Sequence, residues 1–259
     1  MRKLLPYYII VAIGFSLQPA FLSAQTGENW WKREFTIGLN LDPPQRTSKP
    51  GWNSSVLWDS VSSAGFNLSV GLQYKHGVRT DTVHPATRAA NSNVRYLYHD
   101  GNFMKKSVAS SLVEISKQFS ANSGFSGVHV KDEPTQANSD TVLALIRALH
   151  DSFSDKLFFV NLFPTYYFPK DSFNNYKEYV HTFLSDTTLF QVVCFDNYFP
   201  NNCFTDFPAS DSVKRYYSNI SLLRRMSGNR PLWSYVLTTE KRLTEKNIDW
   251  QQAFIRLSA

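Results

Sequence analysis

The sequence predicts an α/β fold: a (β/α)8 TIM-type barrel that lacks its eighth strand. Short apolar runs typical of strands alternate with longer segments typical of helices, which favours parallel strands joined by right-handed crossovers. No glycine-rich phosphate loop follows any expected strand, and this argues against a doubly wound open sheet. The 259 residues could form one large barrel or two small domains, and no linker or repeat divides them.

Seven strands are expected where apolar runs of strand length are bounded by polar or glycine-containing segments. They are residues 35–41, 66–70, 94–98, 125–131, 156–162, 190–196 and 230–236.

Helices are expected between these strands. Val108, Leu112, Ile115 and Phe119 recur at helical spacing, and Gly228 is typical of a helix end. The expected helices are 56–64, 103–120, 138–153, 172–184, 211–226 and 246–257, whereas 71–93 lacks a regular pattern.

The chain stops after the helix expected at 246–257, before any eighth strand. We therefore expect a fragment or a truncated gene product. A barrel of seven strands would leave two unpaired strand edges, which favour aggregation.

The first 24 residues are expected to be a secretory signal peptide. Arg2 and Lys3 precede an apolar run, Leu4 to Leu17, and Phe21-Leu-Ser-Ala24 has the small residues of a cleavage site. A retained N-terminal anchor is the alternative, although the run is short for a membrane span. Residues 25–259 would form the barrel domain, placed in the periplasm, at the cell surface or outside the cell.

Several classes of site and partner have little support in the composition. Cleavage would remove two cations and lower the formal charge from +6 to +4, and the remaining basic residues are scattered, which does not favour nucleic-acid binding. No His-Glu-x-x-His, His-x-His or serine-elbow motif is present, so neither a metal nor an organic cofactor is expected, with His129 left open as a single metal ligand. Cys194 and Cys203 could form a disulfide or remain unpaired thiols. The sequence leaves the oligomeric state open.

The most informative segment is Phe125-Ser-Gly-Val-His-Val-Lys-Asp-Glu-Pro-Thr135. Val128 and Val130 alternate with His129 and Lys131, so one face of this strand is expected to pack on the helices and the other to face the barrel interior. Simple alternation gives Glu133 the interior parity and Asp132 the opposite one. Such barrels keep their chemistry at the carboxyl ends of the strands.

Polar residues follow most of the expected strands, as glycosidic bond hydrolysis by two carboxyl groups requires. We expect Glu133 to be the proton donor, a helix-capping role being its alternative. Asp196 and Glu240 are the candidates for the second carboxylate. The full set of polar residues at or near strand ends is Asn40, Asp42, Asn67, His99, Asp100, Asp132, Glu133, Asn161, Asp196, Asn197 and Glu240.

Aromatic side chains near the same rim could pack against the C–H faces of sugars. Tyr166, Tyr167, Tyr198 and Trp233 are candidates, with packing of the rim or interior as the alternative for each. The residues expected to bind a carbohydrate substrate are Asp132, Asn161, Tyr166, Tyr198, Trp233 and His99.

Four segments occur in order at barrel spacing: Gly127-Val-His-Val-Lys-Asp-Glu-Pro134, Val160-Asn-Leu-Phe-Pro164, Phe195-Asp-Asn-Tyr-Phe-Pro200 and Pro231-Leu-Trp-Ser-Tyr235. In this order the chain resembles exported bacterial proteins, chiefly of Bacteroidetes, described as glycoside hydrolases or beta-galactosidase-like, which are related in pattern to the clan A (β/α)8 glycosidases. The resemblance covers roughly residues 35–259. In the related sequences, the region like Trp250 to Ala259 leads into the eighth strand.

The resemblance implies an exported glycoside hydrolase. Clan A enzymes carry an acid/base Glu after an Asn at the end of the fourth strand; Glu133 matches this Glu, while Asp132 replaces the Asn. Their nucleophilic Glu ends the seventh strand, and Glu240 lies later than that position. A carbohydrate-binding protein without catalysis and an inactive fragment are the alternatives on the same barrel.

Overall fold

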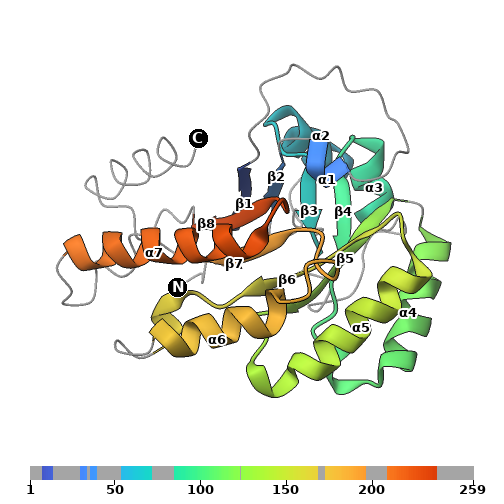
Figure 1. Cartoon of the computed structure of the whole chain (residues 1–259). Coiled ribbons are helices and arrows are strands. Elements are labelled where there is room, and N and C mark those ends of the chain that lie inside the picture. The colour runs from blue at the N-terminus through green and yellow to red at the C-terminus, as the bar shows by residue number, and fades with distance from the viewer. Residues whose placement is uncertain are drawn as a thin grey trace, which may run out of the picture.

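The computed structural model describes residues 8–13, 30–33, 36–39, 54–71, 85–122, 124–168, 173–196 and 209–237. Eight strands close into a barrel in chain order (Figure 1). They are β1 (Tyr8–Ile13), β2 (Ile37–Leu39), β3 (Leu68–Val70), β4 (Arg95–Tyr98), β5 (Phe125–Asp132), β6 (Leu157–Leu162), β7 (Val193–Asp196) and β8 (Leu232–Leu237).

Strands β2 to β8 are parallel neighbours, as a TIM-type barrel requires. The predicted fold class is therefore confirmed: seven parallel strands with helices between them, and no eighth parallel strand in the described part of the chain. The helix expected at 246–257 lies outside the described residues.

The gap in the parallel sheet is filled by β1, which pairs antiparallel with both β2 and β8. The two edges expected to be unpaired thus have a partner in this structure. Because β1 belongs to the segment predicted to be a signal peptide, cleavage after Ala24 would remove this partner. The cleavage itself stays a prediction.

Helices follow most strands, and most of them cover the outside of the barrel (Figure 1). They are α1 (Trp30–Arg33), α2 (Ser54–Ser63), α3 (Pro85–Asn91), α4 (Val108–Ala121), α5 (Ser139–Ser152), α6 (Phe173–Leu184) and α7 (Ala209–Ser227), with 3-10 turns η2 (Phe103–Lys105), η3 (Gln136–Asn138) and η4 (Thr165–Tyr167). Helix α3 lies in the region 71–93 for which no pattern was expected, because its seven residues are too few to show helical periodicity.

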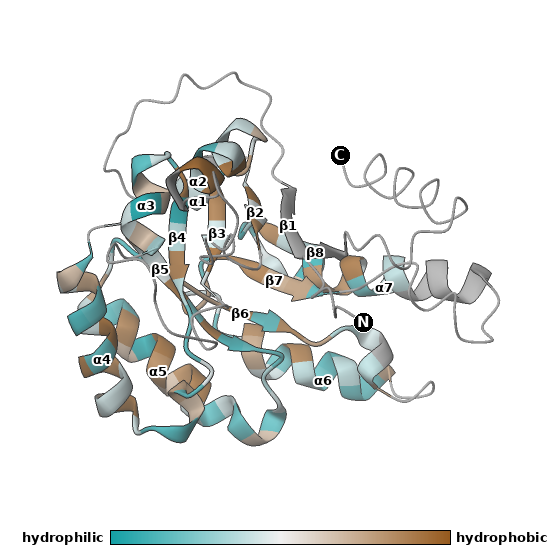
Figure 2. Cartoon of the chain, turned by 180° about the vertical axis from the view of Figure 1, so that it is seen from behind, coloured by the Kyte–Doolittle hydropathy of each residue, from teal (hydrophilic) through white to brown (hydrophobic). Residues whose placement is uncertain are grey.

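The core has two layers, separated by the sheet. The larger layer lies between strands and helices and includes Val128, Val130 and Phe158. The smaller layer fills the barrel interior and includes Phe159, Trp233 and, from α1, Trp31. Helices α4 to α6 carry both hydrophilic and hydrophobic residues along their length, whereas the strands are mainly hydrophobic (Figure 2).

Gly127 fixes the approach of β5 to β6. A Cβ at this position would lie 2.0 Å from the Leu157 carbonyl oxygen, so only glycine allows the two backbones to come this close. The register of β5 against β6, and with it the position of the acidic residues that end β5, depends on this contact.

None of the described helices is long and apolar enough to cross a membrane.

Candidate active site at the carboxyl ends of β5 and β7

A β-bulge in β5 decides which acidic residue faces the barrel interior. His129 pairs with Phe159, but the register then shifts, so that Lys131 pairs with Val160 and Asp132 with Asn161. The extra residue reverses the alternation that the sequence predicts. Lys131 therefore takes a register position on the helix-facing side, and Asp132 shares the interior side with Asn161. Simple alternation had placed Lys131 on the interior side and Asp132 on the opposite side; the register shift exchanges these two positions.

A row of interior side chains crosses neighbouring strands at this level. The Asn161 amide Nδ2 donates to Asp132 Oδ1 at 3.0 Å, and the Cys194 thiol donates to Asn161 Oδ1 at 3.8 Å. Cys194 in turn pairs in register with Trp233 of β8. Asn161 thereby orients the Asp132 carboxylate, and Cys194 is a buried free thiol, as one of the two expectations had it.

Glu133 follows β5 with a backbone conformation that is rare for a residue with a side chain. Its φ is +47°, and its N–H donates to the Asn161 carbonyl oxygen at 2.8 Å. A left-handed non-glycine residue costs about 1 kcal/mol or more, and such strain is concentrated at functional sites. The turn directs the Glu133 side chain toward β7, although the simple alternation of the strand does not continue to this residue.

The carboxyl of Asp196, the last residue of β7, lies within reach of the Glu133 carboxyl, and hydrogen bonding from it lowers the pKa of Glu133. Two carboxyl groups can share a hydrogen bond only when one of them carries a proton. Glu133 is half-buried, whereas Asp196 is only 3% exposed, so the pair lies at the edge of the interior.

The surroundings of the pair favour retention of a proton. Burial, and then the negative charge of Asp132, raise the pKa of Glu133 above its ordinary value; the hydrogen bond from Asp196 and the charge of Lys131 oppose this rise. Closely coupled carboxyls titrate as a pair. The pKa of Glu133 is thus set by opposing influences, of which burial is the largest.

Two tyrosines of α6 lie behind the pair. The Phe163 N–H donates to the Tyr179 hydroxyl oxygen at 3.0 Å, and the Tyr176 hydroxyl donates to Asn219. Burial raises the pKa of both phenols, and the charge of Asp196 adds to the rise at each. Both hydroxyls therefore stay neutral. The sequence pattern missed them because residues of an amphipathic helix are expected in the core, and their spacing gives no further signal.

His99 and His129 belong to the barrel interior. The His99 ring Nδ1 lies 2.8 Å from the His129 carbonyl oxygen and must donate to it, and the His129 ring stacks between His99 and Phe159 at 4.8 Å from each. Burial lowers the pKa of His129 well below its usual range, so its ring is neutral. Within the described ranges, no group of three His, Cys, Asp or Glu residues could hold a metal ion.

The remaining predicted site residues divide into two groups. Trp233 is fully buried, with its ring against Phe159 and Trp30, and so presents no surface to a ligand in this structure. Tyr166 lies within η4, but its side chain is outside the described part. Tyr198, Cys203, Asp42 and Glu240 also lie outside the described residues. Glu240 as the second carboxylate therefore stays a prediction.

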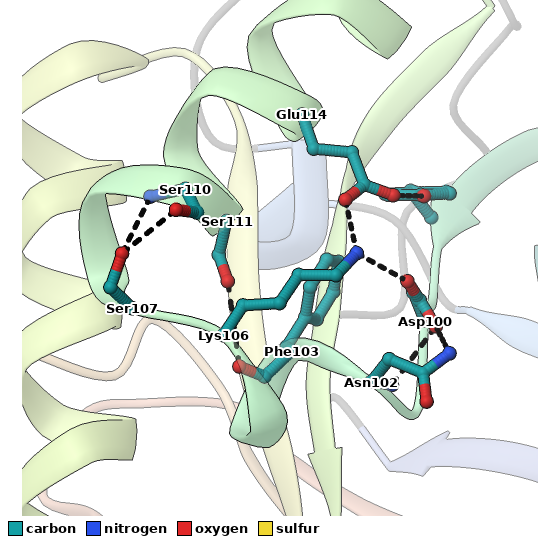
Figure 3. A network of polar contacts seen from close by, with 9 residues as sticks. Asp100, Asn102, Phe103, Lys106, Ser107, Ser110, Ser111 and Glu114 are labelled. Carbon is teal, nitrogen blue, oxygen red and sulfur yellow. Dashed lines mark hydrogen bonds and ion pairs between the residues drawn. The ribbon is translucent and has the colours of Figure 1, made fainter.

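The loop after β4 is held by a separate polar network (Figure 3). Lys106 forms ion pairs with Asp100, at 3.4 Å, and with Glu114, which also accepts from the Tyr98 hydroxyl. Asp100 accepts from the Asn102 N–H at 2.9 Å. Asp100 is one of the polar residues expected at strand ends, and its contacts indicate that it stabilises the loop after β4.

No family model matches this chain, and no curated protein matches it. A solved structure from Bacteroides thetaiotaomicron VPI-5482, described as a "putative alpha-L-fucosidase", is similar to this chain. The similarity covers 73% of this chain and 72% of the chain in that structure. Its sequence identity is 11% and its TM-score 0.48. The chain's own strands and helices define its fold as a (β/α)-type barrel with seven parallel strands.

Proposed function

We propose that this chain is a glycoside hydrolase that uses Glu133 as its acid/base and Asp196 as its second carboxylate. One observation carries the proposal: the carboxyls that follow β5 and end β7 lie within reach of each other where parallel barrels keep their chemistry. The raised pKa of Glu133 supports its role as the group that keeps a proton until the leaving group takes it.

We propose a retaining mechanism, because the two carboxyls lie within reach of each other. Retaining enzymes hold their two carboxyls about 5–5.5 Å apart and inverting enzymes about 6.5–9.5 Å, because inversion needs room for a water molecule.

The chemical steps follow from this arrangement. Glu133 donates its proton to the glycosidic oxygen as the C–O bond breaks, and the Asp196 carboxylate attacks the anomeric carbon. Water then attacks this carbon, Glu133 takes a proton from the water, and Asp196 leaves as a carboxylate. Asn161, through its hydrogen bond to Asp132, holds in place the negative charge that helps Glu133 retain its proton.

The test is a comparison of leaving groups. A panel of aryl and alkyl glycosides of both anomers is assayed with the full chain and with Glu133→Gln. We expect turnover of alkyl glycosides to fall about 10²–10⁴-fold in Glu133→Gln. The loss should be smaller for dinitrophenyl glycosides, whose leaving group needs no proton, and azide should restore turnover with a glycosyl azide of retained configuration.

The control is Asp155→Asn, which neutralises an exposed carboxylate at the far end of the barrel. It should leave turnover unchanged. A folded Glu133→Gln protein that hydrolyses alkyl glycosides at the normal rate would refute the proposal.

A second candidate, a carbohydrate-binding protein without catalysis, is favoured by the burial of Asp196. With 3% of its surface exposed, Asp196 is closed to an anomeric carbon in this structure. Binding of an oligosaccharide without hydrolysis, and equally strong binding to Asp196→Asn, would favour this candidate.

Export is part of the proposal and rests on residues 1–24 alone. The intact mass of the protein recovered from the periplasm and medium of an expressing bacterium tests it. A mass corresponding to a chain that begins at Gln25 supports export with cleavage. Recovery of only the full-length chain, in the cytoplasm, would mean that β1 stays in the barrel.

A further inference from the structure

Tyr167 is an exposed aromatic ring at the carboxyl end of β6, between the two acidic strands in barrel order. It ends η4 and is 57% exposed, the largest exposed fraction among the large hydrophobic side chains of the described residues. Its exposure gives no folding benefit, because apolar surface left in water stabilises nothing. A ring in this place calls for another explanation.

The ring is held rigidly from one side. Phe163 stacks on it at 3.8 Å and 15°, and Phe168 contacts it edge-on at 5.5 Å and 80°. The Phe163 backbone is itself fixed by its hydrogen bond to the Tyr179 hydroxyl. One face of Tyr167 is thus covered and the exposed surface belongs to the opposite side, so a ligand can stack there without paying to order the ring.

The same phenol links Tyr167 to the acid pair. The Tyr179 hydroxyl lies within electrostatic reach of Asp196, Glu133 and Tyr167 together, and all three raise its pKa after burial does. Because η4 follows β6, which lies between β5 and β7, Tyr167 is at the same end of the barrel as the proposed catalytic carboxyls. A sugar bound on Tyr167 would lie at the end of the barrel where Glu133 could protonate a glycosidic bond.

The charges around Glu133 select against anions at this end of the barrel. Asp132, Glu133 and Asp196 bring three carboxyls together, and Lys131 is the cation that acts on Glu133. Uronic acid and sulfated sugars would meet this negative field, whereas the C–H face of a neutral pyranose packs well on a phenol ring.

We propose that Tyr167 is the binding platform for a neutral pyranose ring next to the scissile bond, in a substrate that is an uncharged oligosaccharide. This inference adds a substrate class to the proposed hydrolase function. It depends on that function, because a bond is cleaved next to Tyr167 only if the chain is a hydrolase. Other exposed rings lack these features: Lys177 lies over Phe173 at 5.2 Å, and Tyr217 is on α7, in contact with Tyr216.

The test compares Tyr167→Ala and Tyr167→Phe with Tyr217→Ala, a matched control because Tyr217 is 46% exposed. The probes are neutral tetrasaccharides of gluco, galacto, manno and xylo configuration and tetragalacturonic acid. For a neutral tetrasaccharide that is hydrolysed, Tyr167→Ala should raise KM about 3- to 10-fold with little change in kcat. Tyr167→Phe and Tyr217→Ala should keep the normal KM, and the uronic acid should not be hydrolysed.

A second measurement does not depend on turnover or on the folding of Tyr167→Ala. In Glu133→Gln, tetranitromethane nitration of Tyr167 and Tyr217 is followed by mass spectrometry with and without each tetrasaccharide. Protection of Tyr167, with Tyr217 nitrated as before, supports the platform.

The outcomes separate the two proposals. Turnover with an unchanged KM in Tyr167→Ala and no protection of Tyr167 overturns the platform and leaves the hydrolase standing. Protection of Tyr167 without turnover in the unaltered chain keeps the platform and overturns the hydrolase. Neither turnover nor protection with any tetrasaccharide overturns both, and hydrolysis of tetragalacturonic acid overturns the neutral-substrate part.

Discussion

Polar side chains have different kinds of partner at the two ends of the barrel. Where the strands begin, Arg230 donates to the carbonyl oxygens of Ser227 and Met226 at the end of α7 and of Leu184 at the end of α6. His150 similarly meets the Leu189 carbonyl oxygen. Each of these side chains donates to backbone carbonyl groups, and a cation at a helix carboxyl end is favourable.

Where β5 and β7 end, acids meet acids. Glu133 lies within reach of the Asp196 carboxyl and of the charge of Asp132, and Glu133 also has a strained backbone. Such a cluster costs stability, because like charges brought together from water repel. The difference indicates that one end of the barrel is selected for stability and the other for chemistry.

The largest expected effect tests the acidic end. Asp196→Asn should lower turnover about 10²–10⁴-fold, while the melting temperature stays the same or rises, because one of two opposed carboxyls is removed. Activity assays and thermal unfolding of the same preparation measure both. A strong loss of stability in Asp196→Asn would show that this acid serves the fold, as the polar residues at the other end do.

The next effect tests the opposite end. Arg230→Met keeps much of the side-chain volume but removes the guanidinium that donates to the Met226 and Leu184 carbonyls at two helix ends. We expect the free energy of unfolding to fall by about 2–4 kcal/mol, with turnover per folded molecule unchanged. Urea unfolding and titration of folded protein measure these quantities. Lost turnover in a fully folded Arg230→Met protein would contradict the division between the two ends.

A pH series sharpens the comparison at Glu133. Its pKa is raised in the folded state, so folding is favoured while the group is protonated, and this contribution is lost as the pH rises through the folded pKa. Glu133→Gln cannot titrate. Its melting temperature should match that of the unaltered chain below the ordinary pKa of about 4.5 and exceed it increasingly above that pH. A gap that narrows with rising pH would show that the charge stabilises the fold.

The smallest effect is expected at the β4–α4 loop. Lys106 and Glu114 are each 33% exposed, and ion pairs at this exposure contribute little because water screens them. Lys106→Met should change the free energy of unfolding by less than about 1 kcal/mol. Urea unfolding checks this value. A loss as large as that of Arg230→Met would mean that the network in Figure 3 anchors the barrel as strongly as the helix ends do.

The sequence by itself determined the order of strands and helices. Apolar runs, helical spacing and Gly228 are local signals, and they predicted β2 to β8 to within a few residues. They also placed Glu133 and Asp196 after strands, and parallel strands bring their carboxyl ends to one side of a barrel. Helix α3 was missed because a short, alanine-rich helix has no strong period.

Only the tertiary structure decided which side chains meet. The bulge at Val130 depends on hydrogen bonds between β5 and β6, so no pattern within β5 could predict that Asp132, rather than Lys131, joins Asn161. The contact of Glu133 with Asp196 likewise depends on closure of the barrel across β6. The place of β1 depends on the free edges of β2 and β8, which exist only once the other strands are assembled.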